Sequence, residues 1–319
     1  KVCPDVPPDL ERLVAMARST YETGELVCMH RLCEFLRQIQ TVIDRASPVA
    51  GYELLEVLGS GAKASVFRAY HSDRDIEVAL KIPNEEAANN EDERQRFEDE
   101  ARALQAVCDP AIPKVQDCQI TRDGQRFIAM DLRTGVAARK FSWVGERLTE
   151  DQTLTLGQQL ARAQATLHRR GILHRDLSPT NVLIDLETMT ASVVDLGMAE
   201  LTSIYYAQSK RRYLTPPPGR TRTRPVLHHL EWSAPEAESA DWTDKSDVYS
   251  LGFLLFKMLT GKRPRRNKST EPTPATAYVP DCPTELAELL GQTLAQDPKK
   301  RPSAEVMAAR LREIAEEIE

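Results

Sequence analysis

The sequence predicts an α+β fold in which a small antiparallel sheet comes before a larger helical region, with a helical extension at the N-terminus. Apolar residues alternate with a strand-like period between residues 52 and 132, and from residue 149 onward they recur at helical spacing. With 41% hydrophobic and 28% charged residues, the 319-residue composition is that of a globular protein with a substantial core. Disorder of the whole chain is therefore excluded.

Residues 1–50 are expected to form the helical extension. After a cluster of prolines, apolar residues recur at helical spacing on both sides of Gly24, which breaks the run, and this pattern indicates a two-helix hairpin. The extension is either a regulatory appendage or the remnant of an upstream domain. A simple packing role explains the pattern at least as well.

The sheet region, residues 51–132, is expected to contain five strands and one helix. The predicted strands are Tyr52–Ser60, Ala64–Tyr70, Asp75–Ile82, Lys114–Thr121 and Gln125–Leu132. The first three indicate an antiparallel meander. A charged helix is expected at Glu91–Val107, and Asp123-Gly124 is a strong hairpin turn signal between the last two strands.

The helical region covers residues 133–319. Its long amphipathic segments are Glu150–Arg170, Ser246–Thr260, Thr284–Ala295 and Ser303–Ile318. Two proline-containing stretches, Ser209–Arg224 and Lys262–Pro283, are expected to be loops.

Charge and hydropathy argue against two classes of function. The net charge of −6 disfavours a general nucleic-acid binder. The longest apolar stretch, Val248–Leu259, contains Lys257 and falls short of the about 20 residues that a membrane span needs. The cysteines show neither a C-x-x-C pair nor zinc-site spacing, so a reducing, cytoplasmic setting is expected.

A glycine-containing turn, Gly59-Ser60-Gly61, lies between the first two predicted strands. Glycines let backbone N–H groups approach phosphate oxygens with no Cβ in the way. Taken alone, an ordinary hairpin turn explains the pattern better than a phosphate site does.

Lys81 stands in the otherwise apolar strand Val78–Ile82. An unpaired ammonium group is costly to bury, so this lysine needs an anion nearby. Glu100 on the charged helix is a suitable partner, Glu98 competes with it, and the phosphate oxygens of a ligand are a third choice.

The segment with the most specific chemistry is His174-Arg175-Asp176-Leu177-Ser178-Pro179-Thr180-Asn181, which Asp195-Leu196-Gly197 follows. Asp176 can accept a proton. Asn181 and Asp195 offer the hard oxygen ligands that Mg²⁺ prefers beside a triphosphate.

The order and spacing of these motifs resemble those of the eukaryotic-type protein kinase family. The catalytic-loop pattern H-R-D-L-x-x-x-N is matched in full, and D-F-G corresponds to Asp195-Leu196-Gly197. Ala234-Pro235-Glu236 matches A-P-E, Asp247 stands where the family has a buried helix-capping aspartate, and Arg301 where it has the arginine that pairs with Glu236. The resemblance covers Tyr52 to about Ile318 and implies a bilobal kinase fold, with the N-lobe at 51–132 and the C-lobe at 133–319.

The resemblance also implies roles for the matching residues in a Mg·ATP-dependent transfer to a protein Ser/Thr hydroxyl. Asp176 would be the catalytic base, Lys81 would bind the α- and β-phosphates, and Glu100 would orient Lys81. Asn181 and Asp195 would hold Mg²⁺. The residues that would cover or line the ATP site are Gly59, Gly61, Val66, Ala79, Met130, Asp131, Leu132 and Leu183. Ordinary core packing explains the apolar members equally well.

The chain departs from the family pattern at two positions. Ser178 stands where serine/threonine kinases usually have a lysine that meets the transferred phosphate, and His229 stands where they have a threonine. Ser/Thr specificity is therefore the leading expectation, and two alternatives stay open. One is a pseudokinase or scaffold with little turnover, and the other is a small-molecule kinase of related fold, against which Ala234-Pro235-Glu236 argues.

The segment between residues 195 and 236 has a basic strip, with no acidic residue between Lys210 and Arg224. The strip is expected either to attract an acidic or phosphorylated protein substrate or to be a solvated loop. Arg175 is the residue with which many kinases bind a phosphorylated loop, so autophosphorylation of the 195–236 loop is a further expectation. Its candidate sites are Thr202, Ser203, Ser209, Thr215, Thr221 and Thr223.

Overall fold

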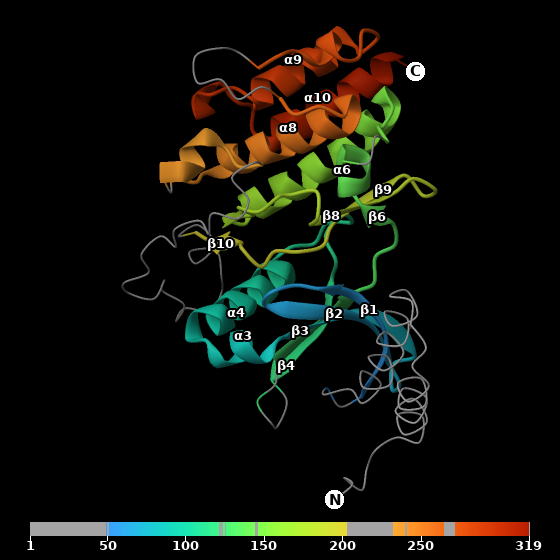
Figure 1. The fold of residues 1–319 in the computed structure, drawn as a ribbon, viewed down its shortest axis with the longest axis vertical. Coiled ribbons are helices and arrows are strands. Elements are labelled where there is room, and N and C mark those ends of the chain that lie inside the picture. Colours follow the sequence, from blue (N-terminus) through green and yellow to red (C-terminus); the bar gives the residue numbers. More distant parts are fainter. Residues whose placement is uncertain are drawn as a thin grey trace, which may run out of the picture. The chain divides into compact units, whose positions relative to one another are not determined.

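The computed structural model describes residues 49, 51–120, 124, 126–143, 146–202, 232–239, 241–264 and 272–318. The predicted helical extension apart from Val49, the Asp123 half of the predicted turn and residues 203–231 lie outside the described residues. The chain divides into two compact units (Figure 1). The first comprises residues 1–94 and 115–132, and the second residues 95–114 and 133–319.

The first unit contains a five-stranded sheet in the order β1-β2-β3-β5-β4. Its strands are β1 (Tyr52–Ser60), β2 (Ala64–His71), β3 (Ile76–Pro83), β4 (Val115–Ile120) and β5 (Arg126–Asp131). All neighbouring strands run antiparallel. All five predicted strands and the antiparallel meander are therefore confirmed, with strand ends within one residue of those expected.

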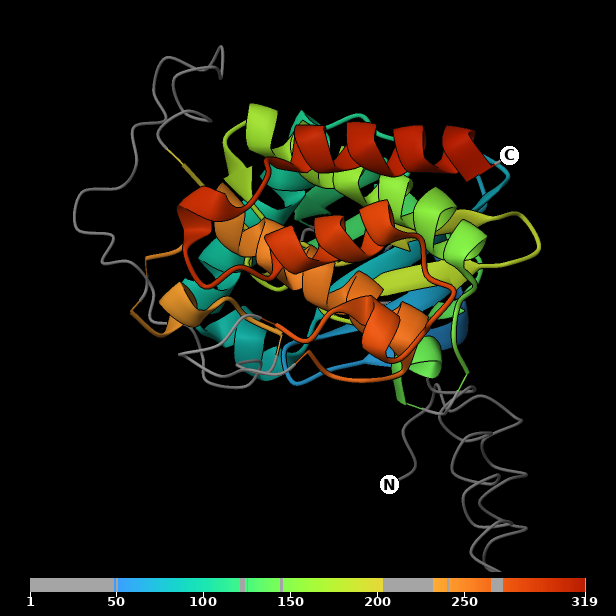
Figure 2. The ribbon, with the colours of Figure 1, turned by 90° about the horizontal axis from the view of Figure 1, so that it is seen from above.

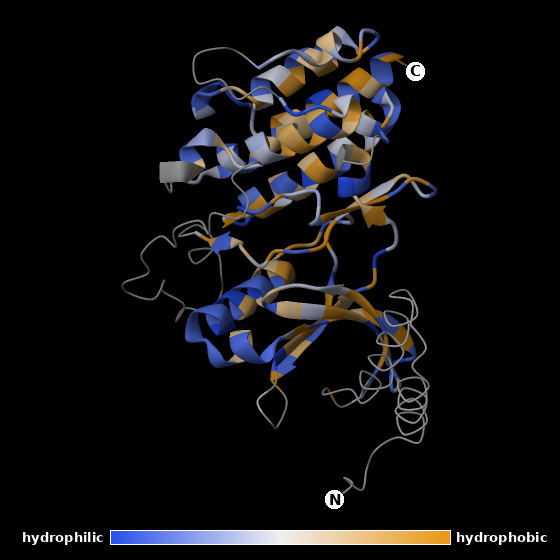
Figure 3. Ribbon diagram, in the orientation of Figure 1, coloured by the Kyte–Doolittle hydropathy of each residue, from blue (hydrophilic) through white to orange (hydrophobic). Residues whose placement is uncertain are grey.

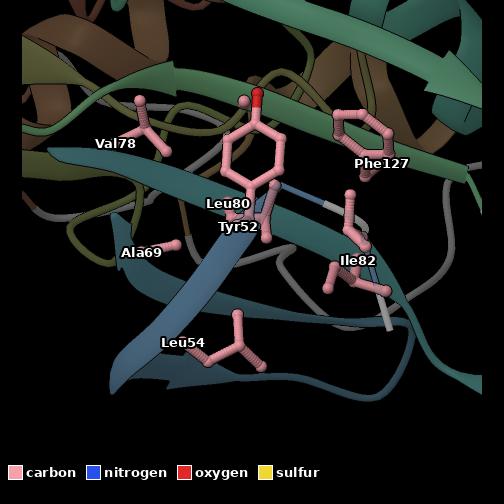
Figure 4. Packing of buried hydrophobic residues seen from close by; sticks show 9 residues of the cluster. Tyr52, Leu54, Ala69, Val78, Leu80, Ile82 and Phe127 are labelled. Carbon is pink, nitrogen blue, oxygen red and sulfur yellow. The ribbon is translucent and has the colours of Figure 1, made fainter. Parts of the chain in front are cut away.

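One face of this sheet carries the hydrophobic core of the first unit. The buried residues of that cluster are Val49, Tyr52, Leu54, Ala69, Val78, Leu80, Ile82, Phe127 and Ala129 (Figure 4). The Tyr52 ring meets the Phe127 ring edge to face, with centroids 5.6 Å apart. Because side chains alternate along a strand, Ala79 and Lys81 on β3 point to the opposite face.

Two helices follow β3. The short helix α3 (Glu85–Asn89), which the sequence analysis did not predict, begins where the Ala87 N–H donates to the Asn84 side chain at 2.9 Å. Helix α4 (Glu91–Ala106) confirms the predicted charged helix, and its first turn is acidic, as the helix dipole favours.

The boundary between the two units falls inside α4. The loop after this helix is fastened to the second unit by Asp109, whose Oδ2 accepts a hydrogen bond from Arg162 Nε at 3.1 Å. The Val193 N–H also donates to the Ala111 carbonyl at 2.8 Å. These bonds explain why residues 95–114 belong to the second unit.

The second unit is mostly helical, as predicted. Its α-helices are α5 (Arg139–Trp143), α6 (Glu150–Arg169), α8 (Asp244–Thr260), α9 (Thr284–Thr293) and α10 (Ala304–Ile318). Helix α8 packs against α6 and α9, and α10 packs along α6 (Figure 2). Helix α8 is buried from Ser246 to Thr260 and strongly hydrophobic (Figure 3). A Cβ at Gly252 would overlap the Thr293 hydroxyl, so this glycine permits the close approach of α9.

Short elements connect these helices. They are β6 (Val136–Ala137), β7 (Ile172–Leu173), β8 (Val182–Asp185), β9 (Thr190–Val193), β10 (Glu200–Leu201) and the 3₁₀ helices η2 (Pro235–Ser239), η3 (Ala275–Ala277) and η4 (Pro298–Lys300). Strands β6, β8 and β9 form one small sheet, and β7 pairs with β10. The motif at residues 174–181 therefore lies between β7 and β8, and Asp195-Leu196-Gly197 lies between β9 and β10.

Within the part of the chain that the structure describes, we find no helix with the length and apolar character of a membrane span.

Candidate active site

The glycine-containing turn joins β1 to β2. The Gly61 N–H donates to the Ala64 carbonyl at 2.9 Å, and Gly59 pairs with Val66 across the hairpin. Neither glycine has a positive φ, and a Cβ at Gly59 would meet no atom within 4 Å. The fold itself therefore does not require glycine at position 59. A remaining reason for glycine at this position is that it lets a ligand approach the backbone closely.

The sheet face opposite the hydrophobic cluster collects most of the nucleotide-site candidates of the first unit. Val66 pairs with Lys81 across β2 and β3, and Ala79 pairs with Met130 across β3 and β5. These four side chains therefore share one face. Lys81 is 9% exposed, and Met130 is buried. Two further candidates stand at the end of β5, where Asp131 and Leu132 are half-buried.

The two glutamates that compete as partners of Lys81 differ in burial. Glu98 is about one-third exposed, and its Oε2 lies 3.1 Å from Arg102 Nη2 on the same helix. Glu100 is only 2% exposed. Burial thus favours Glu100 as the residue with a specific role. Because Lys81 belongs to the first unit and Glu100 to the second, their pairing stays a prediction.

Asp176, Asn181 and Asp195 come together in the second unit. Asn181 Nδ2 donates to the Asp176 backbone carbonyl at 2.9 Å and to Asp176 Oδ2 at 3.0 Å. The Val194 N–H donates to the Asn181 carbonyl at 2.9 Å, which holds the neighbouring Asp195 beside this loop. Asp195 Oδ1 accepts the Gly197 N–H at 2.8 Å. The structure therefore joins the Asn181 amide to the Asp176 carboxylate and places the backbone next to Asp195 against the Asn181 backbone.

The donor set of this cluster fits Mg²⁺ bound together with phosphate groups. The Asn181 amide and the Asp195 carboxylate supply hard oxygens, and Mg²⁺ commonly takes one or two protein ligands and fills its shell with water and phosphate oxygens. In the described segments, no group of three or more His, Cys, Asp or Glu side chains is placed to hold a metal by itself. The residues present thus suit a metal that arrives with a nucleotide.

Buried Asp247 supports the backbone just before Asp176. Its Oδ2 accepts the His174 N–H at 2.8 Å, and its Oδ1 accepts the Arg175 N–H at 2.9 Å. Arg175 has a φ of 65°, a left-handed conformation that is uncommon outside glycine. The carboxylate therefore stabilises a strained backbone next to the candidate base. The position predicted for a buried aspartate is confirmed.

Two further side chains complete the environment of Asp247. His168 Nε2 lies 2.9 Å from Oδ2, and Trp242 Nε1 donates to Oδ1 at 3.1 Å. Burial, the largest influence, raises the pKa of Asp247, but hydrogen bonds from His168 and the Arg175 N–H outweigh it and hold the pKa below its usual value. Asp247 is thus stabilised as a carboxylate. Neither His168 nor Trp242 was identified from the sequence, because no local motif links them to Asp247.

Glu200 is a further residue that the sequence analysis missed. Arg175 Nη1 donates to Glu200 Oε2 at 2.9 Å, and the Arg175 side chain is only 9% exposed. Glu200 lies on β10, paired with Leu173 on β7. The sequence does not show that β7 pairs with β10, so it gave no reason to look for the partner of Arg175 at position 200.

The predicted pair of Glu236 and Arg301 is confirmed. Two hydrogen bonds join them, from Arg301 Nη1 to Oε1 at 2.6 Å and from Nη2 to Oε2 at 2.9 Å. The Ser246 hydroxyl also donates to Glu236 Oε1 at 2.7 Å. Burial, the largest influence, raises the pKa of Glu236, but the hydrogen bonds from Arg301 and Ser246 outweigh it and hold the pKa below its usual value.

Ser178 is buried, and its Oγ lies 2.8 Å from Thr180 Oγ1. Thr180 Oγ1 in turn donates to Asn181 Oδ1 at 3.4 Å. Hydroxyl groups therefore stand where the family has a lysine. His229 and the basic strip lie outside the described residues.

The remaining candidates of the second unit are apolar or belong to the 195–236 loop. Leu183 on β8 is half-buried. Among the candidate phosphorylation sites, only Thr202 lies within the described ranges, and its hydroxyl donates to the Gly171 carbonyl at 2.7 Å. Phosphorylation of Thr202 would break this bond, which argues against Thr202 as the modified residue.

Comparison with known proteins places these features in a family. Residues 52–310 match the family model described as protein kinase domain. The serine/threonine-protein kinase PrkC of Bacillus subtilis is 30% identical over 270 residues, which cover 81% of this chain and 39% of the relative. The serine/threonine-protein kinase PkaA of Streptomyces coelicolor is 32% identical over 293 residues, which cover 84% of this chain and 50% of the relative.

The crystal structure of the Mycobacterium tuberculosis PknI kinase domain superposes with a TM-score of 0.62 at 26% identity, covering 84% of this chain and 98% of the other. The predicted fold is therefore confirmed. The chain spans half or less of the length of the two relatives named above.

Proposed function

The chain belongs to the protein kinase family, and on that premise we propose that it transfers the γ-phosphoryl group of Mg·ATP to a serine or threonine hydroxyl of a protein. The observation that carries the proposal is the cluster of Asp176, Asn181 and Asp195, in which the Asn181 amide binds the Asp176 carboxylate at 3.0 Å. The similarity to two serine/threonine-protein kinases supports the same class of acceptor.

Phosphoryl transfer asks the protein mainly to position the reactants and to neutralise charge. Asp176 is proposed to accept the proton of the attacking hydroxyl. The hydrogen bond from Asn181 Nδ2 orients its carboxylate, and Asp247 fixes the backbone on which it stands. Mg²⁺, which Asn181 and Asp195 would hold, supplies charge neutralisation at the phosphates.

The residues proposed to bind the nucleotide are those that the resemblance to the family implies. Lys81 would bind the α- and β-phosphates, with Glu100 orienting it, and the glycine-containing turn would cover the phosphates through its backbone N–H groups. The residues proposed to cover or line the ATP site are Gly59, Gly61, Val66, Ala79, Met130, Asp131, Leu132 and Leu183. The open space at the Gly59 Cβ position and the shared sheet face of Val66, Ala79, Lys81 and Met130 support this assignment.

The hydroxyl of Ser178 can donate a hydrogen bond but supplies no positive charge to the transferred phosphate. We therefore expect slower transfer than in a kinase with lysine at this position. Turnover is favoured over a scaffold role because the residues that match a base, metal ligands and a phosphate-binding lysine are all present. The Glu236–Arg301 pair next to α8 favours a protein acceptor over a small molecule by resemblance to the family.

The proposed substrate is a protein, and the basic strip between Lys210 and Arg224 favours an acidic or phosphorylated one. Autophosphorylation within residues 195–236 belongs to the same proposal. Because the reaction consumes ATP, we propose a cytoplasmic location.

The test is transfer of label from γ-labelled ATP with Mg²⁺ to the protein itself, to a basic protein, to an acidic protein and to small-molecule acceptors. Wild type should label a protein at Ser or Thr, as mapped by mass spectrometry. Asp176→Asn and Asp195→Asn should abolish labelling, whereas Asp151→Asn, an exposed change of the same kind on α6, should not. Labelling of small molecules alone, or of no acceptor by a wild type that binds Mg·ATP, would contradict the proposal.

A further inference from the structure

We propose that Glu200 is a positioning residue that neutralises Arg175 and so holds the segment carrying Asp176 in place without phosphorylation of the chain. The catalytic part of this inference rests on the proposed function. Its structural part concerns the backbone of residues 171–176 and is measurable without turnover.

The ion pair is the first support for this inference. Arg175 Nη1 and Glu200 Oε2 are 2.9 Å apart, the arginine side chain is 9% exposed and the glutamate side chain is 35% exposed. A guanidinium group that is largely removed from water needs an anion, because burying an unpaired charge is costly. Glu200 supplies that anion from within the chain.

The second support is the rigid frame that presents Glu200. Glu200 pairs with Leu173, and Leu201 pairs with Ile172, in the β7–β10 ladder. Beyond the ladder, the N–H and the hydroxyl of Thr202 both donate to the Gly171 carbonyl, at 2.8 Å and 2.7 Å. The glutamate therefore reaches Arg175 from a strand whose register is set by three consecutive residues on each side.

The third support is the strain that the pair helps to hold. Arg175 has a left-handed backbone with φ of 65°, and its N–H donates to Asp247 Oδ1. Its guanidinium also lies 5.9 Å from the centroid of the Trp242 ring. Asp247 thus holds the backbone of Arg175, while Glu200 and Trp242 hold its side chain. Loss of the Glu200 charge would weaken the hold on the side chain of Arg175, the residue that precedes Asp176.

Phosphorylation commonly orders a loop by placing a phosphate against an arginine. In this chain the Arg175 guanidinium already has a carboxylate against it, and the Thr202 hydroxyl is engaged by Gly171. A phosphate elsewhere in the chain would have to compete with Glu200 for Arg175. We therefore expect the phosphate-free enzyme to be active.

The experiment compares wild type, Glu200→Gln, Glu200→Asp and Glu187→Gln, each treated with a phosphatase and shown by mass spectrometry to lack phosphate. Glu187 is an exposed glutamate in the turn between β8 and β9 and serves as the matched control. Wild type should keep its kcat within about twofold after treatment, and Glu200→Gln should lose about tenfold in kcat with an unchanged KM for ATP. Glu200→Asp should recover part of the loss, and Glu187→Gln should behave as wild type.

Amide hydrogen exchange on the same four proteins separates this inference from the proposed function. Exchange at residues 171–175 and 200–202 should be faster in Glu200→Gln than in wild type and unchanged in Glu187→Gln. Faster exchange in Glu200→Gln than in wild type, found together with a wild type that shows no transfer, would leave the positioning role standing and refute the proposed function. Unchanged exchange in Glu200→Gln, or a wild type that needs phosphate for activity, would overturn the inference.

Discussion

Two arginine–glutamate pairs in the second unit use the same chemical groups in different surroundings. In the Glu236–Arg301 pair, the arginine side chain is fully buried and makes two hydrogen bonds to the carboxylate. In the Arg175–Glu200 pair, Arg175 Nη1 donates to Glu200 Oε2 at 2.9 Å, and the glutamate is about one-third exposed. Each guanidinium lies near an aromatic ring, that of Tyr249 at 4.8 Å and that of Trp242 at 5.9 Å.

This difference separates a pair that holds the fold from one that holds a reactive segment. Arg301 also donates to the backbone carbonyls of Ala295, Lys245 and Gln296, so that it ties the end of η4 to α8 and to the loop after α9. Arg175, the residue before Asp176, is tied by its side chain to Glu200 on β10. We therefore expect changes in the first pair to act on stability and changes in the second to act on turnover.

The largest expected effect comes from Arg301→Met. It leaves the Glu236 carboxylate and three backbone carbonyls without their charged donor, and breaking a buried pair in this way costs about 3–5 kcal/mol. Denaturant unfolding of the variant should show this fall in the free energy of unfolding. Arg312→Met on the exposed side of α10 is the control and should stay within about 0.5 kcal/mol of wild type. Equal free energies of unfolding for the two variants would contradict the claim that the Glu236–Arg301 pair stabilises the fold.

Asp247→Asn should have the next largest effect. Both carboxylate oxygens of Asp247 accept backbone hydrogen bonds, from His174 and Arg175, whereas an asparagine has only one acceptor atom. The amide NH₂ group of the asparagine would then face one of these two backbone N–H groups, which would lose its acceptor at a cost of about 1–3 kcal/mol. The free energy of unfolding should fall by that amount, and kcat should fall at temperatures where the variant is folded. Asp244→Asn at the start of the same helix is the control, and a matching loss of kcat there would count against a specific role for Asp247.

The Glu236–Arg301 pair should also make a smaller contribution to how the free energy of unfolding depends on pH. The pKa of Glu236 is lower in the folded protein than its ordinary value of 4.5, because hydrogen bonds from Arg301 and Ser246 outweigh the effect of burial. The stabilisation that results is complete above the unfolded pKa and is lost as the pH falls through the folded pKa. Between pH 6 and pH 3, the free energy of unfolding should therefore fall less steeply in Glu236→Gln than in wild type. Identical slopes would show that Glu236 does not contribute to acid sensitivity.

The smallest effect on stability is expected for Glu200→Gln. The Glu200 carboxylate is about one-third exposed, and the amide oxygen of a glutamine can still accept the Arg175 hydrogen bond, so the free energy of unfolding should change by less than about 1 kcal/mol. Thermal and denaturant unfolding measure this change. A loss as large as that of Arg301→Met would show that both pairs are structural and would remove the distinction between them.

Periodicity and local turn signals were sufficient to predict the long elements. The five strands of the first sheet and the helices α4, α6, α8, α9 and α10 all lie close to their predicted positions. Strands β7 and β10 were missed because two residues are too short to show a period. Helix α3 was missed because its few residues show no amphipathic repeat.

The candidate site divides in the same way. Asp176, Asn181 and Asp195 were found because they occur in short motifs of fixed spacing, and the structure brings them together. Glu200 and Trp242 were missed because their contacts depend on how separate segments pack. Sequence spacing therefore identifies groups that share a loop, whereas the residues that hold this loop in place emerge only from the tertiary structure.

The most direct test of the central claim is phosphoryl transfer from γ-labelled Mg·ATP by wild type, Asp195→Asn and Glu200→Gln, measured on proteins whose folded state is confirmed by thermal unfolding. We expect transfer to Ser or Thr by wild type, none by Asp195→Asn, and reduced transfer by Glu200→Gln at nearly wild-type stability. A folded wild type that binds Mg·ATP without transferring phosphate, or an Asp195→Asn variant that is as active as wild type, would contradict the account.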